Sequence, residues 1–392
     1  MGRDVNRRLR PSVIKCKTNK LPKMKIEDLA ILFVRGLGSR KLAFLIDSLG
    51  SSEAIFATPA KELQSLYGIS EGVAQQIASK ECFKDAEREA AYCRQRGICA
   101  VSVEDSEYPK PLLETIDRPH VLFVKGNLEA VTKRSLSVVG TREISPSGFN
   151  VIDRMIGGLA SSVYGLSIVS GLAYGVDAAS HRAAIANHIP SIAVMANPLP
   201  DINPTAHRAL AEDIINNGGA LVSELHSQTK QNGKLFLARN RIIAGWSMGT
   251  LIVEAGASGG SWATADMAEG YNRTLMAVPG RITDSASFGT NNLIRSGKAR
   301  LVITPNDIIE DMNWNAMAKP MISNSCGRLE KEGDLIPSEL AILNALDGAT
   351  TLNYDQLLET TGLTMGDLTM SIMTLEIKGF IRCLSGKKYE KI

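Results

Sequence analysis

The stretch "SLSVVGTREISPSGF", residues 135–149, runs from an apolar segment into a turn of small and basic residues. Its apolar part is typical of a short buried strand, and a helix is expected to begin soon after the turn. Gly140, Thr141 and Arg142 stand between the two. Backbone N–H groups, a hydroxyl and a guanidinium at a strand end can hold a phosphate. The stretch therefore predicts an α/β fold with an anion site where a strand ends.

The same pattern of apolar runs separated by helix-length segments continues on both sides of this stretch. The further runs are residues 121–125, 166–170, 191–195, 220–223, 250–254, 274–278 and 300–303. Runs that are apolar throughout indicate a parallel sheet with both faces covered by helices. We therefore expect a Rossmann-like, doubly wound, mostly parallel α/β domain over residues 105–308.

A helical region precedes this domain, over residues 26–100. It contains two glycine-punctuated turns that resemble helix-hairpin-helix motifs, with Gly36 and Gly38 in the first. Such a turn can point backbone N–H groups at a DNA phosphate, so these glycines are possible secondary phosphate contacts. In the second turn Ser70 replaces the outer glycine. Compact hairpins that serve only as packing remain an equal alternative.

Two segments follow the α/β domain. Residues 309–335 are polar and irregular and are interpreted as a linker, with Trp314 able to dock on a neighbouring surface. Residues 336–392 contain three helical segments and a glycine-punctuated hairpin, which is the order of a winged helix. Its third helix has one basic residue, so a protein-docking role is favoured over reading of duplex DNA.

The positive charge of the chain is concentrated at its N-terminus. Residues 1–25 contain nine Lys/Arg and one acid, and the remainder contains 35 Lys/Arg and 40 Asp/Glu. This basic tail is either a segment that binds a polyanion or a solvated extension without a function. No apolar stretch approaches the roughly 20 residues of a membrane span. The six scattered cysteines favour a reducing cytoplasm over a zinc site.

Polar residues that suit nucleic acid recur at other strand ends. Basic and amide side chains beside an aromatic ring are typical of single-stranded nucleic-acid sites, although a capped helix with a buried Phe236 is the alternative for residues 233–247. His181 is interpreted as a packing or capping residue rather than a catalytic base. The further candidate residues are Ser170, Gly171, Lys234, Phe236, Arg239, Asn240, Arg241, Gly260, Ser261 and Thr264.

Signatures of cofactor chemistry are missing from the sequence. The turn at 140–148 lacks the G-x-G-x-x-G spacing of dinucleotide sites, and the chain contains no P-loop. No nucleophile–base pair and no set of metal ligands stands out. We therefore expect a binding protein rather than an enzyme, with no metal and no cofactor.

Several long motifs together resemble those of the DNA-processing protein A (DprA/Smf) family. They are "VVGTR", "SGLAYGVDAASHRAAI", "ARNRIIAGWS", "LIVEAGASGGSWATADMA", "AVPG" and "GTNNLIRSGKARLV", in the family's order and spacing. The resemblance implies a cytosolic bacterial protein that binds and protects incoming single-stranded DNA in natural transformation. It also implies loading of RecA recombinase and a homodimer formed through the Rossmann-like domain.

By motif, the resemblance places DNA contacts on the strand-end residues named above, from Gly140 to Thr264. The chain departs from the family pattern in "ANPLPDINPTAHRAL", which lacks the usual glycines, and at Leu237 and Tyr174. A nucleotide phosphoribohydrolase using the same strand ends is the second hypothesis. Its motif places a glutamate three residues after the threonine, whereas here Met267 follows Thr264 at that spacing and the next glutamate is Glu269.

Overall fold

The computed structural model describes residues 25–66, 68–131, 133–314, 336–347, 351–378, 380–384 and 388–391. The chain forms two compact units, residues 1–320 and residues 321–392. The predictions for the basic tail before residue 25, and for the linker beyond residue 314, lie outside the described residues.

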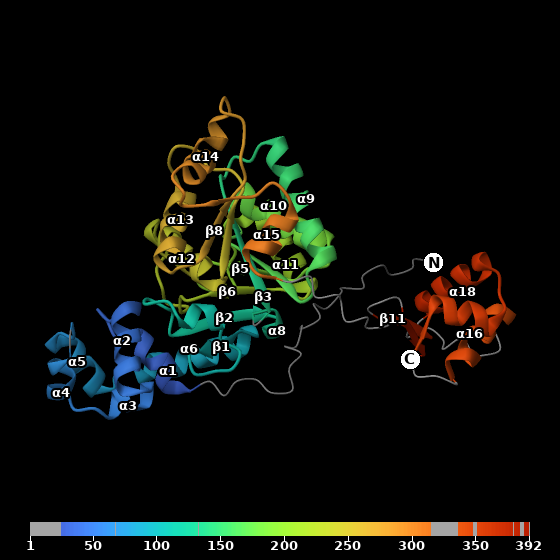
Figure 1. The fold of residues 1–392 in the computed structure, drawn as a ribbon. Coiled ribbons are helices and arrows are strands. Elements are labelled where there is room, and N and C mark those ends of the chain that lie inside the picture. The colour runs from blue at the N-terminus through green and yellow to red at the C-terminus, as the bar shows by residue number, and fades with distance from the viewer. Residues whose placement is uncertain are drawn as a thin grey trace, which may run out of the picture. The chain divides into compact units, whose positions relative to one another are not determined.

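The first unit is built on a nine-stranded sheet with the strand order β1-β2-β6-β5-β4-β3-β7-β8-β9 (Figure 1). The strands from β3 to β9 run parallel, while β1 and β2 are antiparallel. The strands are β1 (Cys99–Ser102), β2 (Val121–Gly126), β3 (Arg134–Val139), β4 (Leu166–Ser170), β5 (Ser191–Val194), β6 (Ala220–Ser223), β7 (Gly249–Ile252), β8 (Thr274–Ala277) and β9 (Arg300–Leu301). The doubly wound, mostly parallel sheet is confirmed.

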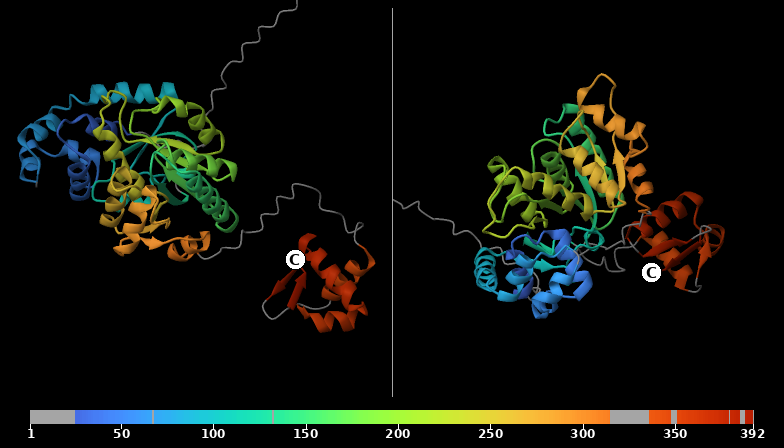
Figure 2. Two further views of the ribbon diagram at one scale, coloured as in Figure 1. Left: turned by 90° about the horizontal axis from the view of Figure 1, so that it is seen from above. Right: turned by 90° about the vertical axis from the view of Figure 1, so that its left-hand side faces the viewer.

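Helices cover both faces of this sheet because successive strand residues point to opposite sides. On one face, Val138 of β3 packs in a core with α9, α10 and α15; on the other, Val139 packs in a core with α12 and α13. Figures 1 and 2 show these helix groups on either side of the sheet. The helices of this body are α7 (Lys110–Leu113), α8 (Leu128–Val131), α9 (Pro146–Ser162), α10 (Val176–Ala186), α11 (Arg208–Asn216), α12 (Lys234–Trp246), α13 (Gly260–Gly270), α14 (Phe288–Arg295) and α15 (Pro305–Asp311).

Two features of this body extend beyond the limits expected from the sequence. Strand β1 lies outside the expected 105–308 domain, yet it pairs with β2 through four residue pairs. At the other end, α15 continues into the segment interpreted as linker, and Trp314 is 7% exposed. The guanidinium carbon of Arg134 lies 5.7 Å from the Trp314 ring centroid. The expected docking of Trp314 is therefore confirmed.

The helical region packs against the sheet domain and belongs to the same unit. It contains α1 (Ile26–Ala30), the 3₁₀ helix η1 (Ile31–Phe33), α2 (Ser39–Leu49), α3 (Ser52–Ala57), α4 (Ala60–Ser65), α5 (Glu71–Ser79) and α6 (Phe83–Arg96). Polar contacts join the two parts: buried His120 Nε2 lies 2.7 Å from Asp28 Oδ1, and half-buried Tyr92 donates its hydroxyl to the carbonyl of Leu199 at 3.0 Å. The hairpins are thus fixed on the α/β body.

The second unit has the order expected of a winged helix. It contains α16 (Pro337–Asp347), β10 (Leu352–Asn353), α17 (Tyr354–Thr361), α18 (Met365–Lys378), β11 (Ile381–Leu384) and β12 (Lys388–Lys391). Its strands form an antiparallel sheet in the order β10-β12-β11 over a core that includes Leu346 and Leu368. Within the described ranges of the whole chain, no helix is long and apolar enough to cross a membrane.

Candidate nucleic-acid interface

The strand order places a topological switch point at the carboxyl ends of β3 and β7. From β3 the chain proceeds to β4, β5 and β6 on one side, and then returns to β7 on the other side of β3. Helices leaving neighbouring strands in opposite directions open a crevice between the strand ends, where ligands of open α/β sheets bind. Gly140 follows β3 directly, and the loop after β7 leads to Gly260. The sequence motifs at these turns therefore meet at one point.

A hollow of about 440 Å³, here called the strand-end pocket, occupies this switch point. Eight of the residues predicted as DNA contacts line it: Gly140, Thr141, Arg142, Arg239, Asn240, Gly260, Ser261 and Thr264. Residues that the sequence did not single out as contacts also line it, among them Glu143, Asp177 and Ser258. Motifs separated by more than a hundred residues thus form one site.

Glycine is required at Gly140 because two chain segments close in on it. An added Cβ would stand 2.5 Å from Val176 Cγ2 and 2.7 Å from the carbonyl oxygen of Glu254. The next residue continues the contact, since Thr141 N–H donates to that same Glu254 carbonyl at 2.8 Å. Arg142 then projects as an exposed side chain beside the pocket. Backbone contacts hold the turn, and the guanidinium of Arg142 is therefore free to meet an anion.

The helix that follows this turn, α9, does not offer an open anion site. Ser145 caps it, and the carboxylate of Glu254 accepts from Ser145 N–H at 3.0 Å and from its hydroxyl at 2.5 Å. A carboxylate at a helix N-terminus takes the place that a bound phosphate would occupy. The N-terminus of α9 is therefore already occupied, and of the strand–turn–helix pattern only the β3 turn remains open to the expected phosphate.

The open helix N-terminus in the pocket belongs to α13. Gly259 precedes it with φ +138°, and no side chain caps it. Gly260 is exposed, whereas Ser261 and Thr264 are buried. The first N–H groups of an α-helix have no partner within the helix and carry partial positive charge. This end of α13 can therefore bind an anion opposite Arg142.

Arg239 lies inside the protein beneath the pocket, with 5% of its surface exposed. Its Nη1 donates to the carbonyl of Gly171 at 2.5 Å and also to that of Val194, so it joins the ends of β4 and β5. Burial lowers the pKa of Arg239, which the nearby Asp177 opposes. Arg239 was predicted as a DNA contact, but its guanidinium is engaged by backbone carbonyls inside the protein. Its guanidinium shapes the pocket floor and contributes positive potential.

Asp177 completes this buried polar layer. Its carboxylate accepts from the N–H groups of Gly171 and Ala173 at 3.1 and 3.3 Å. Burial raises its pKa, and Arg239 and the two N–H groups counteract that rise. Ser170, predicted as a contact, is fully buried and donates its hydroxyl to the carbonyl of Val138 at 2.7 Å. Ser170 and Gly171 thus support the pocket from below and do not line it.

The remaining predicted contacts on α12 divide between two sides of the helix. Phe236, which is half-buried, precedes Asn240 by one turn and Ile243 by two, and the latter two line the pocket. Lys234 is exposed in the first turn. Arg241 points elsewhere. Its Nη2 lies 2.6 Å from Glu224 Oε2 and 3.1 Å from Ser39 Oγ.

Arg241 therefore ties α12 to the start of α2 in the helical region and does not join the other predicted contacts. Gly36 and Gly38 are exposed at that same helix start, and Gly36 has φ +83°. No side chain caps α2. The first hairpin thus presents open N–H groups, as its predicted role in phosphate contact requires, although these two glycines are not part of the strand-end pocket.

His181 is a packing histidine, as expected. It is fully buried on α10, and its Nδ1 lies 3.2 Å from Ser191 Oγ. Burial, with the nearby positive charge of Arg239, lowers its pKa to about 3. The ring is therefore neutral at ordinary pH and is not placed for proton transfer to a ligand. Among the described residues, no group of three or more His, Cys, Asp or Glu could hold a metal ion.

Comparison with known proteins matches both parts of the chain. Residues 99–313 match the family described as DNA recombination-mediator protein A, and residues 330–387 match the DprA winged helix domain. Protein Smf of Escherichia coli (strain K12) is 34% identical over 304 residues, covering 77% of this chain and 80% of that protein. DNA processing protein DprA of Streptococcus pneumoniae is 38% identical over 213 residues, covering 54% of this chain and 74% of that protein. The X-ray structure of DNA processing protein A from Streptococcus pneumoniae aligns with a TM-score of 0.60 at 28% identity, covering 74% of this chain and 99% of that one.

Proposed function

Since the chain belongs to the DNA recombination-mediator protein A (DprA/Smf) family, we propose that it binds single-stranded DNA in the strand-end pocket and delivers the strand to a RecA-type recombinase. The observation that carries this proposal is the pairing of two anion-binding features across one hollow. Exposed Arg142 lies on one wall and the uncapped N-terminus of α13 forms another. Both bind phosphate without reference to base identity.

The neighbouring surface of α12 extends this site in a way that suits an unpaired strand. Lys234 is an exposed cation, and Phe236 lies on the helical face that carries Asn240. An aromatic ring next to phosphate-binding groups can stack on an unstacked base, typically worth about 1–3 kcal/mol per base. In a duplex the bases are already stacked, so this combination favours single-stranded DNA.

We propose that the protein binds DNA without catalysing a reaction on it. His181 beneath the pocket is neutral and enclosed, with its pKa lowered to about 3 by burial and by Arg239. The carboxylate of Asp177 is occupied by two backbone N–H groups. A nucleotide phosphoribohydrolase would need a carboxylate free to approach a ribose. Glu143 is exposed at the rim, and a test for base release must therefore include it.

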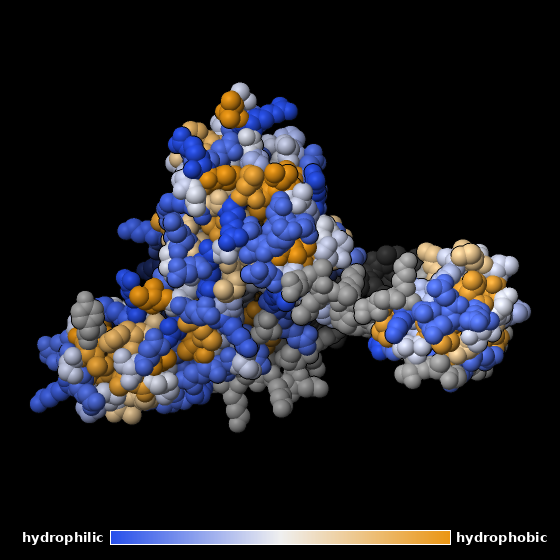
Figure 3. Space-filling model, viewed as in Figure 1, coloured by the Kyte–Doolittle hydropathy of each residue, from blue (hydrophilic) through white to orange (hydrophobic). Residues whose placement is uncertain are grey.

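Self-association through the Rossmann-like domain is part of the same proposal. The strand order ends on β9, whose Leu301 is 45% exposed, and Ile303 just beyond it is 56% exposed. Phe288 at the start of α14 is also exposed. Figure 3 shows a band of apolar surface on the α/β body. An unpaired edge strand with apolar side chains is a ready surface for a second copy. Sedimentation of wild type and Ile303→Asp tests this, with a monomeric variant expected.

The test of DNA binding is fluorescence anisotropy with a labelled oligo-dT at several salt concentrations. Arg142→Gln is expected to weaken binding at least tenfold and to reduce the salt slope by about 0.7 for one lost phosphate contact. Arg154→Gln is the matched control, because Arg154 is exposed on α9 and lines no part of the pocket. Equal binding by both variants would move the DNA away from the pocket. Release of adenine from AMP, lost in Arg142→Gln or Glu143→Gln, would replace this proposal with an enzyme.

Transfer of the strand to a recombinase requires a separate assay. RecA assembly on oligo-dT already covered by a single-strand-binding protein is followed with and without the chain. We expect faster assembly with wild type and no acceleration with Arg142→Gln. Acceleration by that variant would separate RecA loading from the strand-end pocket.

A further inference from the structure

A second hollow lies at the opposite end of β3 from the strand-end pocket. Arg134 and Ser135, the first residues of β3, line it, and its volume is about 320 Å³. We call it the strand-start pocket. It shares no lining residue with the strand-end pocket. A ligand of this hollow would therefore not compete directly with DNA bound at the switch point.

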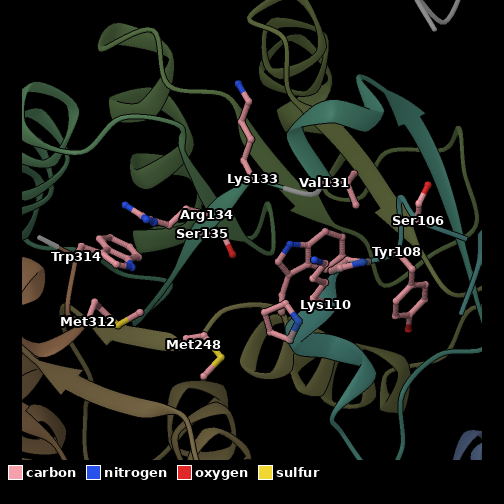
Figure 4. Close-up of a pocket in the computed structure, with 13 residues that line it drawn as sticks. Ser106, Tyr108, Lys110, Val131, Lys133, Arg134, Ser135, Met248, Met312 and Trp314 are labelled. Atoms are coloured by element: carbon pink, nitrogen blue, oxygen red, sulfur yellow. The ribbon is translucent and has the colours of Figure 1, made fainter. Parts of the chain in front are cut away.

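The interior of the strand-start pocket is apolar. Tyr108 and Trp246 are each 1% exposed and Trp314 is 7% exposed. Two methionines also line the pocket (Figure 4): Met312, which is half-buried, and Met248, which is 47% exposed and whose sulfur lies 3.1 Å from Arg273 Nη1. Methionine side chains are flexible and polarizable, and they adapt to apolar groups of different shape. The interior thus suits one inserted apolar side chain.

The rim of this pocket is basic. Lys110, Lys133 and Arg134 line it, and no aspartate or glutamate of the described part of the chain does. Figure 4 shows Arg134 reaching toward Trp314, where its guanidinium carbon lies 5.7 Å from the ring centroid, while Lys133 extends away from the other labelled side chains. An arginine held on an aromatic ring is oriented before a ligand arrives. The rim therefore favours a carboxylate-bearing ligand.

A hydrogen-bond donor in the pocket lining lacks an acceptor. Trp246 lines the pocket, and its Nε1 is buried with no partner among the described residues. A buried donor without a partner costs about 1–3 kcal/mol, so a group that supplies an acceptor here stabilises the complex by satisfying it. A carbonyl or carboxylate oxygen of a ligand would satisfy this N–H. The donor is independent of the charge on the rim and calls for the same ligand chemistry.

We propose that the strand-start pocket binds an acidic peptide segment of a partner protein, with one apolar side chain inserted between Met248 and Met312. The carboxylates of the segment meet Lys110 and Arg134 at the rim. Nucleic acid fits less well, because base stacking needs open aromatic faces. Here the two indoles and the phenol ring are more than nine-tenths buried. The partner can therefore bind while DNA occupies the other end of β3.

Intrinsic fluorescence tests this directly, because the chain has three tryptophans and two of them line the pocket. The third, Trp262, donates its indole N–H to the carbonyl of Gly256 beside the strand-end pocket. All measurements therefore use the full chain with Trp262→Phe. The probe is the capped peptide Asp-Asp-Leu-Met-Asp-Asp. Its two controls replace the aspartates with asparagine, or the Leu-Met pair with serine.

The expected result is a saturable fluorescence change with the acidic apolar peptide and at least tenfold weaker binding of either control peptide. Arg134→Gln and, separately, Lys110→Gln are each expected to weaken binding at least fivefold, whereas Arg154→Gln leaves it unchanged. Lys110 is exposed, so its variant remains informative if Arg134→Gln fails to fold. No saturable change, or equal binding by all variants, would overturn the proposal. So would a change with oligo-dT, in place of the peptide, in a chain that also carries Arg142→Gln.

Discussion

Replacing Arg239 with methionine is expected to destabilise the α/β body strongly, because this arginine holds two strand ends together from inside. The substitution removes donors to the carbonyls of Gly171 and Val194. Hydrogen bonds from a charged donor are worth about 1.5–3 kcal/mol each. Removing a buried guanidinium also removes its own desolvation cost. We therefore expect a net loss near the lower end of the sum, about 3 kcal/mol of unfolding free energy.

Urea unfolding followed by far-UV circular dichroism measures this loss. With a slope of roughly 3 kcal/mol per molar urea, the midpoint should fall by about 1 M. Arg142→Met is the matched control, because the Arg142 side chain is exposed, and its midpoint should stay close to that of wild type. A midpoint for Arg239→Met within about 0.2 M of wild type would refute the structural role assigned to Arg239.

The same variant has a predicted pH dependence, which comes from Asp177. Burial already raises the pKa of this carboxyl, and Arg239 opposes the rise. Without Arg239 the folded-state pKa rises further above that of the unfolded chain. The folded state of the variant then binds the proton more tightly, so the penalty is full above the raised pKa and shrinks as the pH falls through it. The difference from wild type should be larger at about pH 8 than at about pH 5.

Three further outcomes follow from single contacts. Gly140→Ala should cost about 1–3 kcal/mol, since its Cβ would stand 2.5 Å from Val176 Cγ2, whereas Gly38→Ala, with open space around it, should unfold like wild type in urea. The pKa of His181 is lowered to about 3, so the unfolded chain binds this proton at a higher pH than the folded chain does. Wild-type stability should therefore decline from about pH 6.5 toward pH 3, with a slope of up to ~1.4 kcal/mol per pH unit. His181→Gln should remove this slope. Glu254→Gln should lower thermal stability by the equivalent of about 1 kcal/mol, because a charge at the start of α9 is lost. The anisotropy of oligo-dT should stay unchanged. Weaker DNA binding by this variant would mean that the carboxylate orders the pocket.

The sheet could be predicted from the sequence because its parallel strands are short runs that are apolar throughout. Every such run that the sequence indicated is a strand. Strand β1 was not predicted, because it has only four residues and begins two residues after Gly97, which ends helix α6 with φ +64°. Its strand state depends on pairing with β2, which is a tertiary contact. The local sequence pattern does not show which strand such a segment will pair with.

The candidate site was predicted in its residue types and not in the direction of each side chain. Adjacent helix residues differ by about 100° in direction, so Arg239, Asn240 and Arg241 cannot all face one ligand. The spacing of Phe236, Asn240 and Ile243 would have indicated which face lines the pocket. No local signal could have shown that Arg241 meets Glu224 and Ser39, because those residues are distant in sequence. The position of a residue around the helix therefore decides whether its side chain faces the pocket or packs inside the protein.

The proposed binding of a flexible strand in this pocket agrees with the division between exposed and buried cations. Arg142 is exposed at the pocket, whereas Arg239 is fixed between the ends of β4 and β5. A binding site already in its final geometry loses less conformational entropy when the ligand arrives. Burial lowers the pKa of His181 most, and the positive charge of Arg239, which also shapes the pocket floor, lowers it further. A polar layer that both fixes geometry and suppresses acid–base chemistry suits the proposed role, in which the protein holds DNA and releases it intact.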